Sequence, residues 1–394
     1  MGNWKTCILA DLGEIVGGAT PSTKNECYYG GDIPWITPKD LSTFKGRFIS
    51  RGERNITIDG LNNCSTRLIP SHSVLFTSRA PIGYVAIAEN ELCTNQGFKS
   101  IVPNKSTDFL FLYYLLVHNR EKIENMGSGT TFKEVSSSVM RRITVTVPTN
   151  IEEQQAIARI LGALDNKIEN NNAVNHHLEQ MAQAIYAQAF PCRDNPTIPI
   201  SELIDVRDGT HDSPKVVEKG FPLVTSKHLL PFGVDLVTPN LISKADFDKI
   251  NERSKVDRHD ILISMIGTIG LISLVIEHEI NFAIKNVGLF KTSQTEDWVY
   301  FMLCFLRSPE TKNHIDMRLA GSTQKYISLG ELRQLPIFVP TVDELMDFNN
   351  TVRPLFEKIA LHTKETLYLI TLRDTLLPRL MSGELSIPDL GGVK

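Results

Sequence analysis

The sequence predicts an α/β (α+β) protein in which two similar domains are separated by two long antiparallel helices that form a coiled-coil spacer. Two observations lead to this prediction. Motifs of the first half of the chain recur in the second half at an offset of roughly 190 residues. Each copy is followed by a long stretch whose apolar residues have the spacing of a coiled-coil helix. At 394 residues the chain is also too long for one ordinary core.

The repeat consists of three blocks that keep their order. The paired blocks are 34–41 with 222–229, 72–76 with 259–263, and 129–133 with 321–325. A Val-Pro pair closes each copy, at 147–148 and at 339–340. We therefore expect five segments: domains at 1–147 and 193–340, helical spacers at 148–192 and 341–385, and a C-terminal tail at 386–394.

Short β-rich runs between Gly, Pro and Asn turns predict strands within each domain. One helix is expected per domain, with Thr107 and Thr295 as its N-caps. The expected strands are 73–77, 84–88, 261–265 and 271–276, and the expected helices are 108–126 and about 297–306.

Three further residues of the repeat are expected to be structural. His72 and His259 come directly before two of the predicted strands, which favours a role at the strand start over a catalytic one. Trp35 aligns with Leu223 across the repeat and is expected in the core, with a base-stacking platform as the alternative.

Both long stretches carry polar residues near the middle of an apolar 4-3 repeat. Asn171 and Asn175 interrupt the first seam, and His362 and Thr366 interrupt the second. If the helices pair antiparallel, Asn171 and Asn175 lie opposite His362 and Thr366. Such a polar layer costs some stability and fixes the register of the pair.

The residues leave two alternatives open for these stretches. The three asparagines at 170–172 are compatible with a loop that splits the first stretch into a hairpin. Both stretches are also compatible with ordinary core helices. Pro354 marks either a kink or the first turn of a helix.

The charge of the chain argues against a protein that coats nucleic acid, because its net value is −4. Residues 1–150 nevertheless carry 16 Lys+Arg and 13 Asp+Glu, a net charge of +3. Any contact with DNA is therefore expected from local patches and not from a global positive field.

The six cysteines are scattered without a CxxC pair, so neither a disulfide framework nor a zinc site is expected, and a reducing cytoplasm is the natural compartment. The longest apolar run, 109–117, is too short to cross a bilayer. The N-terminus lacks the pattern of a signal peptide.

The sequence contains no complete catalytic motif of the three kinds that it most nearly matches. Residues 194–197 (DNPT) lack the second proline and the aromatic ring of an adenine methyltransferase motif. Residues 17–24 lack the second glycine of a P-loop. Asp246, Asp248 and Lys249 come closest to a nuclease metal cluster but are typical of a charged turn. The sequence predicts no active site and no metal site on this chain.

Taken together, the motifs resemble the specificity subunit of type I restriction–modification enzymes. The resemblance covers nearly the whole chain and is carried by 17–22 (GGATPS), 33–38 (IPWITP), 127–131 (GSGTT), 147–155 (VPTNIEEQQ) and 377–385 (LPRLMSGEL). The chain departs from the pattern at 208–214 (DGTHDSP), where the second domain replaces the GGATPS loop, and at 343–345 (DEL), which replaces the EEQQ run.

The resemblance implies a non-catalytic DNA-binding subunit with two target-recognition domains, each reading one half of a split, asymmetric sequence in double-stranded DNA. The helices would act as a ruler and as docking sites for two methyltransferase subunits, to which restriction (translocase and nuclease) subunits are added. S-adenosylmethionine, ATP and Mg²⁺ would belong to those partners, and this chain would hold no cofactor.

The candidate DNA contacts are basic and polar residues of the loops, since such side chains read bases and bind phosphates. Lys39 and Lys227 match across the repeat, as do Lys133 and Lys325, although each is also compatible with a solvated surface lysine. The Gly- and Thr-rich turns at 127–131 and 321–323 are compatible with a phosphate-binding loop or with a simple tight turn. The candidates are Thr20, Ser22, Lys24, Lys39, Arg47, Arg79, Lys99, Thr131, Lys133, His211, Lys227, Lys285, Thr323 and Lys325.

Two other classes of function remain open on the residues alone. One is a helical protein–protein scaffold without DNA readout, and the other is an enzyme with an unusual site.

Overall fold

The computed structural model of the chain describes residues 4–129, 133–191, 196–321 and 324–387. Its contacts divide the chain into two compact units. The first unit comprises 1–169 and 368–394, and the second comprises 170–367. The last part of the chain therefore belongs to the same unit as its beginning.

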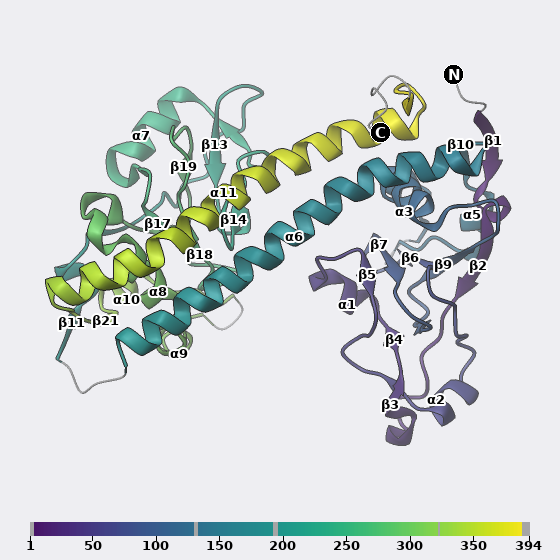
Figure 1. Ribbon diagram of the computed structural model, residues 1–394, viewed down its shortest axis with the longest axis horizontal. Coiled ribbons are helices and arrows are strands. Elements are labelled where there is room, and N and C mark those ends of the chain that lie inside the picture. The colour runs from purple at the N-terminus through teal and green to yellow at the C-terminus, as the bar shows by residue number, and fades with distance from the viewer. Residues whose placement is uncertain (1–3, 130–132, 192–195, 322–323, 388–394) are drawn as a thin grey trace. The chain divides into compact units, whose positions relative to one another are not determined.

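The first unit is built on a five-stranded sheet of order β2-β9-β6-β7-β5 (Figure 1). Two smaller pairings flank it: β1 pairs antiparallel with β10, and β4 pairs parallel with β8. Helix α3 packs on β6 and β7, where Phe76, Phe111 and Leu115 are buried together. The strands are β1 (Trp4–Ile8), β2 (Gly13–Gly17), β3 (Tyr29–Ile33), β4 (Trp35–Ile36), β5 (Phe48–Ile49), β6 (Val74–Ser78), β7 (Ile82–Ala88), β8 (Cys93–Thr94), β9 (Lys99–Pro103) and β10 (Thr144–Pro148). The short helices are α1 (Pro38–Thr43), α2 (Ile58–Asn62), α3 (Phe109–His118), α4 (Arg120–Asn125) and α5 (Ser137–Arg142).

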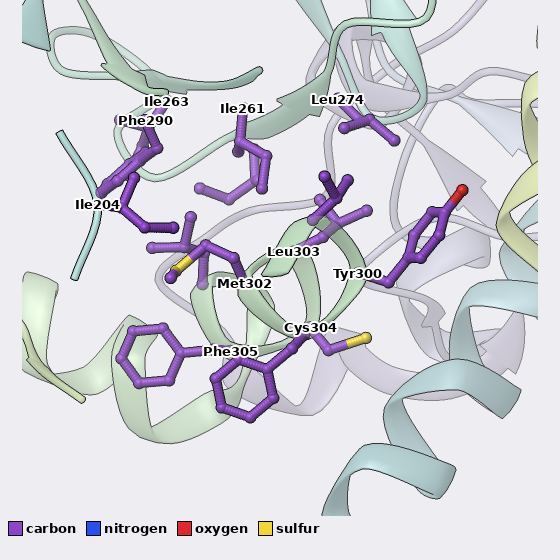
Figure 2. Packing of buried hydrophobic residues seen from close by; sticks show 14 of the residues in the cluster. Ile204, Ile261, Ile263, Leu274, Phe290, Tyr300, Met302, Leu303, Cys304 and Phe305 are labelled. Carbon is purple, nitrogen blue, oxygen red and sulfur yellow. The ribbon is translucent and has the colours of Figure 1, made fainter. Parts of the chain in front are cut away.

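The second unit has a four-stranded sheet of order β12-β20-β17-β18. Helix α8 covers it: Met302 and Leu303 point toward the sheet residues Ile261 and Leu274, and Phe305 points to the opposite side of the helix (Figure 2). The strands are β11 (Thr197–Pro199), β12 (Val206–Asp208), β13 (Phe221–Val224), β14 (Leu229–Leu230), β15 (Gly233–Val234), β16 (Leu241–Ile242), β17 (Ile261–Ser264), β18 (Ile272–Leu274), β19 (Ala283–Ile284), β20 (Val287–Phe290) and β21 (Pro336–Phe338). The short helices are α7 (Lys244–Ser254), α8 (Val299–Arg307), α9 (Pro309–Met317) and α10 (Leu329–Arg333).

The sequence repeat is a structural repeat. The order β12-β20-β17-β18 reproduces β2-β9-β6-β7, and the parallel pair β13–β19 reproduces β4–β8. The antiparallel pair β11–β21 reproduces β1–β10. His72 and His259 also match in backbone conformation, with left-handed φ values of 67° and 70° at the entrance to β6 and β17. These histidines stand at the strand starts.

Two long helices pack antiparallel, as expected. Helix α6 (Ile151–Ala189) has 39 residues and α11 (Val342–Met381) has 40. Because α6 continues through its three central asparagines, the hairpin alternative is wrong. Pro354 lies inside α11 and does not start it. No helix of the described residues combines the length and apolar character that a membrane span needs.

The helix predicted at 108–126 is in fact two helices. Asn119, with φ −90° and ψ 7°, separates α3 from α4. The N-cap of α3 is Asp108, whose carboxylate accepts from the amide of Phe111, and not Thr107. The Thr107 hydroxyl instead donates to Asn104.

In the second unit, α8 begins at Val299 after a 3₁₀ turn, and Trp298 takes the N-cap position expected for Thr295. The charged turn expected at Asp246, Asp248 and Lys249 is part of helix α7, which Ser243 caps. Each unit thus has several helices where one was predicted.

Candidate nucleic-acid interface

In the first unit, the loop that follows β2 lies against the turn between β8 and β9. The amide of Ala19 donates to the carbonyl oxygen of Thr94 at 3.0 Å. Thr20 donates its hydroxyl proton to Oε1 of Gln96. A Cβ on Gly18 would lie 2.0 Å from the Thr94 oxygen, so this close approach requires glycine. We call this contact the first loop pair (residues 18–24 with 95–97).

The second unit repeats the construction with different side chains. Thr210 donates its amide to the carbonyl oxygen of Ile284 at 3.0 Å, and a Cβ on Gly209 would lie 2.3 Å from that oxygen. His211 Nδ1 lies 2.7 Å from Oδ1 of Asn286, and Lys285 donates to the hydroxyl of Ser213. We call this contact the second loop pair (residues 209–215 with 285–286).

A charged cluster stands beside the first loop pair. Arg79 and Lys99 each place a nitrogen 3.5 Å from the carboxylate of Glu134. Lys99 is nearly buried and also donates to Ser78 at 3.4 Å, whereas Lys133 is exposed next to Glu134. The cluster therefore holds two cations on one carboxylate.

The second unit lacks these charges at the matched positions. The β-bridge between Arg79 and Glu134 corresponds to a bridge between Ile266 and Tyr326. Tyr326 is 43% exposed, and Lys325 beside it is exposed as Lys133 is. A charged contact of the first unit is thus replaced by an apolar and an aromatic residue.

Lys39 and Lys227 occupy the same turn of the two units. Each follows a threonine that caps the turn, with Asp40 or His228 completing the capping box. Burial, and then the charge of Lys227, lower the pKa of His228, whose Nδ1 accepts from the backbone amide of Thr225 at 2.9 Å. Both lysines are exposed, and Lys39 forms an ion pair with Glu53 at 2.6 Å.

Arg47 has a different place from the other candidates. Its residue exposure is 5%, and its guanidinium donates to Glu169 at 2.9 Å and to Asn166, both on α6. Next to it, Tyr114 donates to Asp165 at 2.5 Å, and Arg373 of α11 donates to the same carboxylate at 2.8 Å. Arg47 therefore links the sheet of the first unit to helix α6. Its guanidinium is buried, so the prediction that Arg47 contacts DNA is wrong.

The remaining candidates lie in the loops. Ser22 and Lys24 are exposed in the first loop pair. Thr131 and Thr323 lie outside the described residues, and the two alternatives for their turns, a phosphate-binding loop and a tight turn, stay predictions.

The polar residues of the long helices meet inside the second unit. Asn171 donates to Glu365 at 2.8 Å and to Thr366 at 3.4 Å. Asn175 Oδ1 lies 3.1 Å from Nδ1 of His362. The predicted opposition of these side chains is therefore present, and both asparagines are 1% exposed.

Sequence reasoning missed several residues of these sites. It did not identify Gln96, Asn286 or Glu134, nor Thr363, which accepts from Asn175 at 3.3 Å. Extending the repeat to 93–97 and 283–287 would have pointed to the first two, because these segments adjoin matched parallel strands. Within the described residues, no group of three His, Cys, Asp or Glu is placed to hold a metal ion.

Comparison with known proteins relates the whole chain to one family. A family model described as the type I restriction modification DNA specificity domain matches residues 1–180. The chain is 33% identical to the type I restriction enzyme MjaIX specificity subunit of Methanocaldococcus jannaschii, over 98% of this chain and 95% of that protein. It is 29% identical to the HindI specificity subunit of Haemophilus influenzae over 42% of this chain and 38% of that one. The crystal structure of a type I restriction–modification S subunit from M. genitalium has the same fold, with a TM-score of 0.57, 18% identity and 96% coverage of both chains.

Proposed function

The chain belongs to the family of type I restriction–modification DNA specificity subunits, the non-catalytic members of those enzymes, and on this premise we propose that its two domains read the two halves of a split, asymmetric DNA target. The observation that carries this proposal is the pair of matched loop contacts. They keep their backbone hydrogen bonds and change their side chains, as two readers of different sequences require.

We assign the two target-recognition domains to 1–147 and 193–340, the spacers to 148–192 and 341–385, and the tail to 386–394. Each spacer contains one of the long helices. The candidates that are exposed or half-buried are proposed to contact DNA: Thr20, Ser22, Lys24, Lys39, Arg79, Lys133, His211, Lys227, Lys285 and Lys325.

The long helices are proposed to set the distance between the two half-sites. A slip of one helix along the other would separate Asn171 and Asn175 from their partners and bury polar groups against leucine or isoleucine, which disfavours any other register. The spacing of the target would then be a fixed property of the chain.

Partners would supply the chemistry. Two methyltransferase subunits would dock on this chain and bring S-adenosylmethionine, and restriction subunits would bring ATP and Mg²⁺. We place the assembly in the cytoplasm, consistent with the free thiols of Cys7, Cys27, Cys64, Cys93 and Cys304.

Co-expression with the cognate methyltransferase subunit, followed by mapping of methylated bases, tests the proposal. We expect one motif with two fixed halves and a gap of constant length. The chain alone, given DNA, Mg²⁺ and S-adenosylmethionine, should be inert. A contiguous motif, or methylation by the chain alone, would contradict the proposal.

Salt dependence separates DNA reading from a purely scaffolding role. The affinity of the assembled complex for its DNA duplex should fall as the salt concentration rises. Lys39→Ala with Lys227→Ala should reduce the slope of log affinity against log salt by the equivalent of about 2 phosphate contacts. Lys105→Ala with Lys219→Ala, which removes two other exposed lysines, serves as the control. A scaffold without DNA readout would show no salt-sensitive binding.

A further inference from the structure

The two loop pairs differ in the hydrogen-bonding groups that they expose, although their backbones agree. The amide of Asn95 donates to the carbonyl oxygen of Ile36 at 3.0 Å, and the amide of Lys285 donates to that of Val224 at 2.8 Å. The two turns therefore leave their parallel strands in the same way. In this register Lys285 matches Asn95 and Gln96 matches Asn286, so Gln96 and Lys285 stand at adjacent positions of the same scaffold. One is a neutral amide and the other is a cation.

The Gln96 amide is held in a defined orientation. The hydroxyl of Thr20 donates to Oε1, which identifies this atom as the acceptor and leaves it a second lone pair. Among the described residues, none accepts a hydrogen bond from Nε2. The exposed side chain thus offers one acceptor and one donor side by side, the pattern that pairs with N6 and N7 of adenine in the major groove.

Lys285 offers donors only. Its ammonium group has three N–H bonds, and among the described residues Ser213 is the one acceptor that it reaches. The carboxylate of Asp208 contacts other residues, Arg253 and, at 3.1 Å, His211. A group with two donors to spare and no acceptor matches O6 and N7 of guanine, which are both acceptors.

We propose that the two loop pairs are the base-reading elements of the chain, with Gln96 reading an adenine in one half-site and Lys285 reading a guanine in the other. Thr20 and Ser213 act as positioning residues that aim these two side chains. This inference rests on the proposed function and adds to it which side chain reads which base.

Methylation mapping of variant complexes tests the inference. Gln96→Ala should relax one adenine position of one half-site, with discrimination there falling about tenfold, and leave the other half unchanged. Lys285→Ala should relax one guanine position of the other half-site to a similar extent. Thr20→Val, which cannot orient the amide, should weaken discrimination at the same adenine as Gln96→Ala.

A change of preference is a sharper readout than a loss. Gln96→Lys should convert the adenine position to a preference for guanine, and this result is not expected if Gln96 only stabilises the loop. Asn62→Ala and Lys249→Ala remove an exposed amide and an exposed ammonium from helices α2 and α7, which are not part of the loop pairs, and should leave the motif intact.

The outcomes separate this inference from the proposed function. If the wild-type complex yields no split motif, the proposed function fails. If it yields a split motif that Gln96→Ala, Gln96→Lys and Lys285→Ala leave unchanged in folded complexes, the function stands and the inference is overturned.

Discussion

The two units differ at a buried pair of residues that joins neighbouring strands of the same sheet. In the first unit Val74 pairs with Ile101, and in the second Ile261 pairs with Phe290. The adjacent positions are Ser73 and Val102 in the first unit but Asp260 and Lys291 in the second. Lys291 contacts Asp260 at 2.5 Å, with 3% and 0% of their side chains exposed.

This difference shows which features a duplicated fold must keep. Sheet order, strand register and apolar pattern are common to both units. A buried ion pair and a Ser/Val pair serve equally within that frame, because each leaves few buried polar groups unsatisfied. Polar residues of the interior therefore diverge as long as their partners change with them.

Removing one member of the buried ion pair should have the largest effect. Lys291→Met leaves the carboxylate of Asp260 unpaired in the interior and should destabilise the second unit by about 3–5 kcal/mol. Hydrogen exchange on full-length chain should show lost protection in β17 and β20, with β6 and β9 of the first unit unchanged.

The first unit supplies the matched control for this change. Asp260→Ser with Lys291→Val copies Ser73 and Val102 and should recover most of the stability that Lys291→Met loses. If the double variant is as unstable as Lys291→Met, the two units are not interchangeable at this position.

Cutting the arginine contacts with α6 should have the next effect. Arg47 fastens the first unit to Glu169, and Arg307 fastens the second to Glu179 at 2.6 Å. Arg47→Met should lower protection of α3 by about 2 kcal/mol and leave α8 protected. Arg47→Lys should not restore it, since one ammonium cannot replace a guanidinium that reaches two side chains. Equal loss in both units would contradict separate fastening.

Replacing the polar layer should have a smaller effect of opposite sign. Asn171→Leu with Asn175→Leu should raise stability by about 1–2 kcal/mol, because each leucine buries apolar surface while the hydroxyl of Thr363 keeps its bond to Ile359 O. We expect a higher unfolding temperature by calorimetry together with methylation at more than one half-site spacing. A large loss of stability would refute the role given to the polar layer.

The smallest predicted effect concerns the matched histidines. Burial, and then the charge of Arg258, lower the pKa of His259 below 6.5. The unfolded chain therefore takes up the proton first, and the stability of the second unit should fall as pH drops below about 6.5 until the folded pKa is passed. His259→Asn, which tolerates a φ of 70°, should remove that part of the pH dependence in urea titrations between pH 7.5 and 5.5. An unchanged profile would refute this assignment.

The sequence was sufficient to predict the duplication, the two long helices and their polar centre, because these depend on local spacing and order. It did not predict α7, whose eleven residues are mostly polar and bury only Ile250 and Ser254. It also could not distinguish Arg47 from its exposed neighbours, since its partner Glu169 lies 122 residues away. Long-range partners of charged residues are not visible in composition or periodicity.

The glycines at the base of the two loop pairs bear on how new target specificities are engineered. Because the close approach of each loop to its turn requires glycine at Gly18 and Gly209, a replacement segment is best joined immediately after them. Segments grafted at 19–24 and 210–215 would keep the backbone hydrogen bonds to Thr94 and Ile284 as long as their first residue is not proline. A graft that also replaces the glycine would push a side chain into the carbonyl oxygen of Thr94 or Ile284. The clash would displace the loop whose side chains the graft is meant to change.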